Sequence, residues 1–147
     1  MTSKASMFES RYEEMILQNQ SNFLSEGDSI VDIVFLNNTI LNDPKVQRLG
    51  IALNQTFEIQ PRAIFTTKGV DNLDDFGIVE SSSKAVGLID IGILHAYAKM
   101  VNPKYAVFIC EKSFSKELSY LLTDPVIAPK LLNYGQNRSI QFLDHKS

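Results

Sequence analysis

Short apolar segments rich in β-branched residues alternate along this chain with longer segments whose apolar residues recur at helical spacing. This alternation is typical of β–α–β units, in which helices cover the faces of a largely parallel sheet. The sequence therefore predicts an α/β fold with a mostly parallel central sheet of four to five strands, flanked by helices. The predicted strands are 29–36, 61–67, 104–110 and 138–144, with 76–80 either a fifth strand or an extended entry into the next helix. The predicted helices are 5–24, 44–57, 84–101 and 113–124, followed by a short one within 125–135.

These elements are expected to share one domain. The chain has 147 residues, of which 44% are hydrophobic and 21% are charged, and both fractions are ordinary for a globular domain. No repeat, low-complexity tract or linker divides the sequence. We therefore expect residues 1–147 to form a single α/β domain, in which residues 1–25 are an extra N-terminal helix that docks on the core or binds a partner.

The charge pattern argues against two classes of partner. The formal net charge is -3 and no cluster of Lys and Arg occurs, so we expect no nucleic-acid binding. Uncharged apolar residues never run together for the length of a bilayer span, so we expect no membrane insertion. A single cysteine, Cys110, permits no internal disulfide and fits a reducing compartment. A cytoplasmic location is the expectation.

The stretch "SSSKAVGLIDIGILHAYAKMV" predicts a helix over 84–101 with three serines at its entrance. Ser81, Ser82 or Ser83 is expected to cap this helix, since a serine hydroxyl accepts hydrogen bonds from the free N–H groups of a first turn. A single sheet covers one side of a helix, so the rest of so apolar a surface is expected to meet another helix or a second subunit. The apolar residues that nearly encircle the predicted helix are Val86, Leu88, Ile89, Ile91, Ile93, Leu94, Tyr97, Met100 and Val101.

Three residues of this helix do not fit a simple apolar helix. Gly87 and Gly92 each cost about 1 kcal/mol relative to alanine, which predicts close approach of a neighbouring backbone. Asp90 would cost several kcal/mol if it were buried without a partner. One expectation is that Asp90 lies on a solvent-exposed face of the helix or forms a hydrogen bond with a neighbouring loop. The other is that it contacts a ligand or a partner.

Sequence motifs for cofactor chemistry are missing. Neither a dinucleotide fingerprint nor a phosphate-binding P-loop occurs. The "TTKG" loop after the second strand is interpreted either as a plain turn or as an anion site made by backbone N–H groups. His95 is expected to be a half-buried packing residue, His145 lies near the end of the chain, and Cys110 ends an apolar strand. We therefore expect no catalytic residues, no metal ligands and no cofactor.

Two short stretches are similar to parts of known metal-site patterns. "GIVESSSKA" resembles the start of Toprim domains, in which the glutamate matching Glu80 works beside magnesium, but the later strands end in "FICEKS" and "FLDHKS" and supply no D-x-D. Nuclease chemistry of the restriction-enzyme type would draw on Asp90, Glu111 and Lys112. Because neighbouring residues of a strand face opposite sides, Glu111 and Lys112 are not expected to reach one metal.

The second half of the chain, from "RAIFTT" to "IQFLD", is similar in layout to STAS-like domains, the family of anti-sigma-factor antagonists and their relatives. The shared layout is the strand "RAIFTT", a long helix ending at "KMVNPK", the strand "YAVFIC", the helix "KELSYLL" and the final strand "SIQFLD". The resemblance implies a regulatory domain that binds a partner protein. Some members are switched by phosphorylation of a serine in a D-S-[ST]-G loop, and Ser81 to Ser83 lack the flanking Asp and Gly of that loop.

The leading functional expectation is a non-catalytic regulatory or protein-interaction domain that self-associates. The alternative is a small nucleotide- or anion-binding enzyme that uses the loops at the C-terminal ends of the strands, where open α/β sheets bind ligands. The candidate ligand-binding residues are Asn37, Thr67, Lys68, Ser81, Ser82, Ser83, Glu111 and Lys112.

Overall fold

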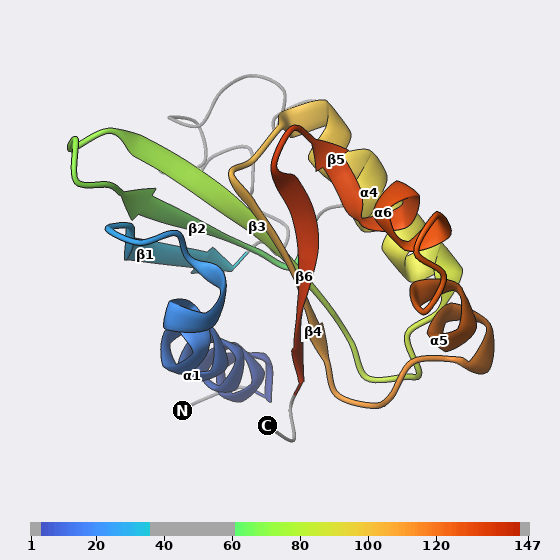
Figure 1. Ribbon diagram of the computed structural model, residues 1–147. Helices are drawn as coiled ribbons and strands as arrows, with labels where there is room; N and C mark the ends of the chain where they lie inside the picture. The colour runs from blue at the N-terminus through green and yellow to red at the C-terminus, as the bar shows by residue number, and fades with distance from the viewer. Residues whose placement is uncertain (1–3, 36–60, 145–147) are drawn as a thin grey trace.

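The computed structural model describes residues 4–35 and 61–144, which form three layers with a sheet in the middle (Figure 1). One helix covers one face of the sheet, and three helices cover the other face. The predicted helix 44–57 and the candidate Asn37 lie outside the described residues. The elements are α1 (Lys4–Phe23), β1 (Ser29–Phe35), β2 (Ala63–Lys68), β3 (Asp74–Ser82), α4 (Leu88–Val101), β4 (Tyr105–Cys110), α5 (Lys116–Leu122), α6 (Ile127–Leu132), β5 (Asn133–Gly135) and β6 (Arg138–Asp144).

Within the described residues, the sheet has six strands in the order β1-β2-β3-β4-β6-β5. The α/β class is confirmed, but the prediction of a mostly parallel sheet is wrong. Only β3–β4 and β4–β6 are parallel, whereas β1–β2, β2–β3 and β5–β6 are antiparallel. In both parallel pairs, helices lie between the two strands along the chain, because a parallel partner needs a crossover connection.

The β2–β3 hairpin is the main reason for this difference. A tight turn joins the two strands: the Gly69 N–H donates to the Leu73 carbonyl at 3.3 Å, and Asn72 has a φ of 62°. Asparagine tolerates this left-handed conformation better than most residues. The sequence predicts a polar loop over 68–77, but half of these residues are strand, because β2 ends at Lys68 and β3 begins at Asp74 rather than at Phe76.

The layer between α1 and the sheet contains an aromatic cluster. Tyr12, Ile16 and Phe23 of α1 are buried against the sheet. The rings of Phe23 and Phe65 meet edge to face, with centroids 5.7 Å apart. Phe65 lies opposite Gly77 in the β2–β3 register, and its ring occupies the space that a Cβ at Gly77 would need. A glycine is therefore required at this position of β3.

The other layer packs α4, α5 and α6 on the sheet. Ile91, Leu94 and Ala98 of α4 are buried in a cluster with Phe108 of β4 and Ile140 of β6. All six residues of β4 are buried, so this central strand is covered on both faces. That double coverage explains why "YAVFIC" is apolar without alternation, and it confirms the strand predicted at 104–110.

The start of α4 differs from the prediction. The helix begins at Leu88, after an N-cap at Gly87, whereas Ser81 and Ser82 are the last residues of β3. The prediction of a serine cap is therefore wrong: pairing with β4, in which Ser82 faces Cys110, holds this segment extended. Asp90, in the first turn of the helix, accepts a hydrogen bond from the N–H of the N-cap residue Gly87 at 2.8 Å.

The two helices after β4, α5 and α6, lie within the segments predicted to be helical. In α5 the N-cap is Ser115, whose hydroxyl accepts a hydrogen bond from the Leu118 N–H at 3.1 Å. The short helix predicted within 125–135 is α6. Across residues 4–35 and 61–144, no helix combines the length and the apolar character that a bilayer crossing requires.

Candidate functional site

The sheet has two edges at which polar residues gather. We call the edge where β3, β4 and β6 end at Ser82, Cys110 and Asp144 the carboxyl edge. We call the opposite edge, where β4 and β6 begin at Tyr105 and Arg138, the amino edge. A parallel arrangement of these three strands places their ends together, so residues distant in sequence meet at each edge.

The carboxyl edge brings together five of the candidate ligand-binding residues. Ser82 lies opposite Cys110, and the Glu111 N–H donates to the Ser82 carbonyl at 3.3 Å. This bond places the segments that follow β3 and β4 side by side. The candidates that meet here are Ser81, Ser82, Ser83, Glu111 and Lys112.

The remaining described candidates lie at the amino edge. Because β2 is antiparallel to β3, Thr67 and Lys68 are found where β3 begins, opposite Asp75 and Asp74. Thr67 is buried, and the Lys68 ammonium lies 3.9 Å from the Asp74 carboxylate. The "TTKG" segment is the start of the hairpin turn. The Gly69 N–H donates to the Leu73 carbonyl within this turn, so it is not free to bind an anion. The predicted ligand residues therefore do not form one site.

Glu80 is the most unusual ionisable residue of the carboxyl edge. It lies on the α4 side of β3, like Ile78 two residues earlier, and its carboxylate accepts a hydrogen bond from the Ser81 N–H at 2.9 Å. Burial raises the pKa of Glu80, while the Ser81 bond and the charge of Arg62 oppose that rise. Asp90 adds a second nearby carboxylate, so Glu80 holds a proton more readily than an exposed glutamate does.

Ser81 lies on the opposite face of β3, toward α1. Ser81 is 8% exposed, and its hydroxyl oxygen has no hydrogen-bond partner among the described residues. A buried polar atom without a partner is uncommon in folded proteins and calls for a specific cause. On the same side of the edge, the guanidinium of Arg11 lies 3.5 Å from the Glu111 carboxylate and ties α1 to the end of β4.

The described residues offer little for metal or nucleophile chemistry. Within 4–35 and 61–144, no group of three His, Cys, Asp or Glu side chains is placed to hold a metal ion. Cys110 is buried, and burial raises the pKa of its thiol to about 12, with a smaller contribution from Asp144. The thiolate form that nucleophilic chemistry needs is thus disfavoured. His95 is half-buried and shares a 2.8 Å hydrogen bond with the Asn133 carbonyl, which links α4 to β5.

The outer face of α4 is apolar and exposed. Ile89 is 78% exposed and Met100 is 58% exposed, and both lie on the side opposite the buried Leu94. Gly92 and Ala96 lie between them on the same line, and no other element of the described residues comes within 4 Å of where a Cβ of Gly92 would be. The close approach that the sequence predicted at Gly92 is therefore not made by residues 4–35 or 61–144.

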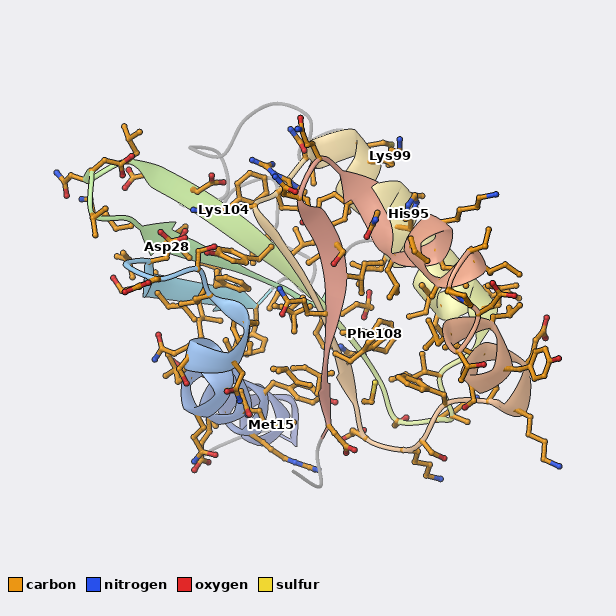
Figure 2. All side chains as sticks on the ribbon, viewed as in Figure 1. Met15, Asp28, His95, Lys99, Lys104 and Phe108 are labelled. Carbon is orange, nitrogen blue, oxygen red and sulfur yellow. The ribbon has the colours of Figure 1, made fainter. Side chains whose placement is uncertain are left out.

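The amino edge holds a cluster of charged and hydroxyl groups that we call the clasp: Asp28, Lys104 and Tyr105. The Lys104 ammonium lies 2.7 Å from the Asp28 carboxylate, and the Tyr105 hydroxyl donates a short hydrogen bond to the same group. Figure 2 shows Asp28 and Lys104 next to each other beside the sheet. The Ser25 N–H donates to the Tyr105 oxygen at 2.9 Å, so the clasp joins the end of α1 to the start of β4.

Each group of the clasp has a shifted pKa. The bond from Lys104 lowers the pKa of Asp28, with help from the Tyr105 hydroxyl. The bond to Asp28 raises the pKa of Lys104. Burial raises the pKa of Tyr105, and the Asp28 carboxylate adds to that rise. The pair therefore stays ionised, and the phenol stays neutral, over the ordinary pH range.

A cleft of about 310 Å³ opens beside the clasp. The ligand-binding residues predicted from the sequence do not line this cleft, because open α/β sheets usually bind ligands at the carboxyl ends of strands. The sequence carries one signal for the cleft: Lys104 and Arg138 each stand at the start of a predicted strand, and parallel strands bring their starts together. The lining includes Lys104, Tyr105, Gln136, Asn137, Arg138 and Gln141.

Comparison of the chain with protein-family models, curated proteins and solved structures finds no match in any of the three.

Proposed function

We propose that this protein is a non-catalytic regulatory or protein-interaction domain that self-associates through the outer face of α4. One observation carries the proposal: Ile89 and Met100 expose most of their side chains on a helix face that the rest of the described chain leaves open. Large apolar side chains exposed along one line are typical of a docking surface.

The order of large and small residues on this face favours a second copy of the same chain. Ile89, Gly92, Ala96 and Met100 follow one another at helical spacings and form a large–small–small–large pattern. When two copies cross in antiparallel fashion between Gly92 and Ala96, Ile89 of each copy lies beside Met100 of the other. Such a two-fold interface requires a surface that is complementary to itself, and this pattern meets the requirement.

Gly92 adds a second reason. Glycine inside a helix costs about 1 kcal/mol relative to alanine, and no other element of the described residues occupies the space beside Gly92. Helix axes approach more closely where the residues at the crossing are small. A partner helix packed at Gly92 would explain why a glycine occupies this position, which the described residues by themselves do not explain.

The resemblance of the second half to STAS-like domains agrees with an interaction role. The described chain contains a strand or helix at each place that the resemblance implies, namely β2, α4, β4, α5 and β6. It also contains β3, which lies between β2 and β4 in the sheet. The STAS-like assignment is offered as part of the proposal and rests on the layout of these elements.

Sedimentation equilibrium tests the proposal directly. We expect the unmodified chain to sediment as a dimer, and Ile89→Glu to shift it to a monomer, because the interface would then bury a charge. Leu73→Glu is the matched control, because Leu73 is 68% exposed but lies in the β2–β3 turn. A monomeric unmodified chain, or an equal effect of both substitutions, would rule out α4 as the dimer face.

A second candidate function is the binding of a small nucleotide or anion at the carboxyl edge. The buried hydroxyl of Ser81 favours this candidate, because it has no hydrogen-bond partner in residues 4–35 and 61–144. Thermal melting against a panel of nucleotides and metal ions tests this candidate, since a ligand that binds the folded state raises the melting temperature by mass action. Ser81→Ala should abolish any such shift, and a shift that survives this substitution would place the ligand elsewhere.

A further inference from the structure

We infer that the cleft at the amino edge is a binding site for a small ligand that carries one oxyanion group, a carboxylate or a phosphate. Among the described residues, the cleft is lined by two cationic side chains, Lys104 and Arg138, and by no carboxylate. This inference goes beyond the proposed interaction function, because the cleft lies at the amino edge and not on the outer face of α4.

Arg138 is held in place by neutral partners. Its Nη1 donates to the Asn102 carbonyl at 2.8 Å, the Asn102 side-chain oxygen at 3.1 Å and the Pro103 carbonyl at 3.1 Å. No carboxylate pairs with this guanidinium within the described part of the chain, so its charge is not neutralised. Its remaining N–H groups keep their capacity to bind an oxyanion in a forked geometry.

Lys104 is held in place by the clasp. Its ammonium lies 2.7 Å from Asp28 and 5.8 Å from the centre of the Tyr105 ring. An ammonium group has three hydrogens, so the bond to Asp28 leaves two for a ligand. Because both cations are already fixed in the ligand-free protein, binding would lose little side-chain entropy.

Neutral donors complete the lining and limit the ligand to a modest charge. Gln136 and Asn137 form the turn between β5 and β6. Gln141 and Phe23 also line the cleft, and the Gln141 side chain donates to the Phe23 carbonyl at 3.4 Å. Asp28 and Asp75 lie close enough to Lys104 to raise its pKa. These two carboxylates offset much of the positive charge, which favours a single oxyanion over a polyanion.

Titration with inorganic phosphate and, separately, with sodium acetate tests the inference. At constant ionic strength held with sodium chloride, we expect saturable shifts in the backbone amide NMR signals of residues 104–105 and 136–141. A stronger effect of phosphate would identify the ligand as a phosphate, and a stronger effect of acetate would identify it as a carboxylate. No saturable shift with either anion, or shifts confined to other residues, would overturn the inference.

Asn137→Asp gives a sharper test, because it adds a negative charge to the cleft with little change in shape. Asn137 has a φ of 58°, which aspartate also tolerates. We expect its anion affinity to fall about tenfold by charge repulsion. Asn72→Asp is the matched control, since Asn72 has a φ of 62° in the β2–β3 turn and does not line the cleft. An unchanged affinity in Asn137→Asp would overturn the inference.

Discussion

The Lys104 ammonium lies 2.7 Å from the Asp28 carboxylate, so a charge pair joins the turn after α1 to the start of β4. The Asp28 side chain is almost fully buried, and the Tyr105 hydroxyl bonds the same carboxylate. The aromatic cluster beneath α1 lies next to this pair, since Phe23 and Tyr105 have ring centroids 6.3 Å apart. A charge pair and aromatic packing therefore both hold the end of α1 against the sheet.

Asp28→Asn should lower the free energy of unfolding by about 2 kcal/mol at neutral pH, because it removes the charge from two hydrogen bonds. The pKa of Asp28 in the folded protein lies below its ordinary value of 3.8. Its contribution is therefore complete above pH 3.8 and is lost as the pH falls through the lower folded-state pKa. Urea unfolding at a series of pH values measures this effect.

The control for this change is Asp74→Asn. Asp74 is an exposed partner of Lys68 at 3.9 Å, and surface pairs of this kind contribute less than about 1 kcal/mol. If the two substitutions lowered stability equally, or if Asp28→Asn left the acid part of the stability profile unchanged, the clasp would not be the stabilising contact described here.

Gly77→Ala should destabilise the protein by about 2 kcal/mol, since the added methyl group collides with the ring of Phe65 and forces the core to shift. Thermal or urea unfolding measures the loss. Combining Gly77→Ala with Phe65→Leu should recover part of it, because a leucine lacks the ring that occupies this space. Additive losses in the double variant would contradict the proposed collision.

Gly92→Ala should have opposite effects on the monomer and on the dimer. The monomer should gain about 1 kcal/mol, because alanine favours the helix and no other element of the described residues lies within 4 Å of the added Cβ. The dimer should dissociate at higher protein concentration, because the added methyl group separates the two helices. Unfolding at low concentration and sedimentation at high concentration measure the two effects, and an unchanged dimer would refute a crossing at Gly92.

Asp90→Ala should cost about 1 kcal/mol, because the Gly87 N–H at the start of α4 loses its acceptor. The far-ultraviolet circular dichroism of the folded protein should stay the same while the unfolding midpoint falls. Lys99→Ala, an exposed change on the same helix, is the control and should alter stability by less than about 0.5 kcal/mol. A neutral Asp90→Ala would show that the bond contributes nothing.

Cys110 should react very slowly with a thiol reagent in the folded protein. With a pKa of about 12, only about one thiol in ten thousand is ionised at pH 8, and the side chain is buried as well. In urea the reaction should become fast, since the unfolded thiol has an ordinary pKa. Fast labelling under native conditions would mean that the end of β4 opens readily.

The individual elements could be predicted because their signals are local. The segment 138–144 coincides with β6, and 104–110 differs from β4 by one residue. The bonds at the starts of α5 and α4 are also local, joining residues three positions apart, although the sequence prediction named neither Ser115 as the cap of α5 nor Asp90 as the acceptor for Gly87. The predictions that were wrong depended on partners remote in sequence. Ser81 and Ser82 are strand residues because they pair with Ile109 and Cys110, about thirty positions further along.

The sequence alone determined most of the described strands and helices and their apolar faces, because spacing and turn residues act within a few positions. Only the tertiary structure decided the direction of each strand and the neighbours it pairs with. It also decided that Asp28 would meet Lys104, and that Arg138 would join Lys104 at one cleft. These contacts join residues far apart in the chain, and their free energies depend on the packing of the whole sheet, which no local pattern encodes.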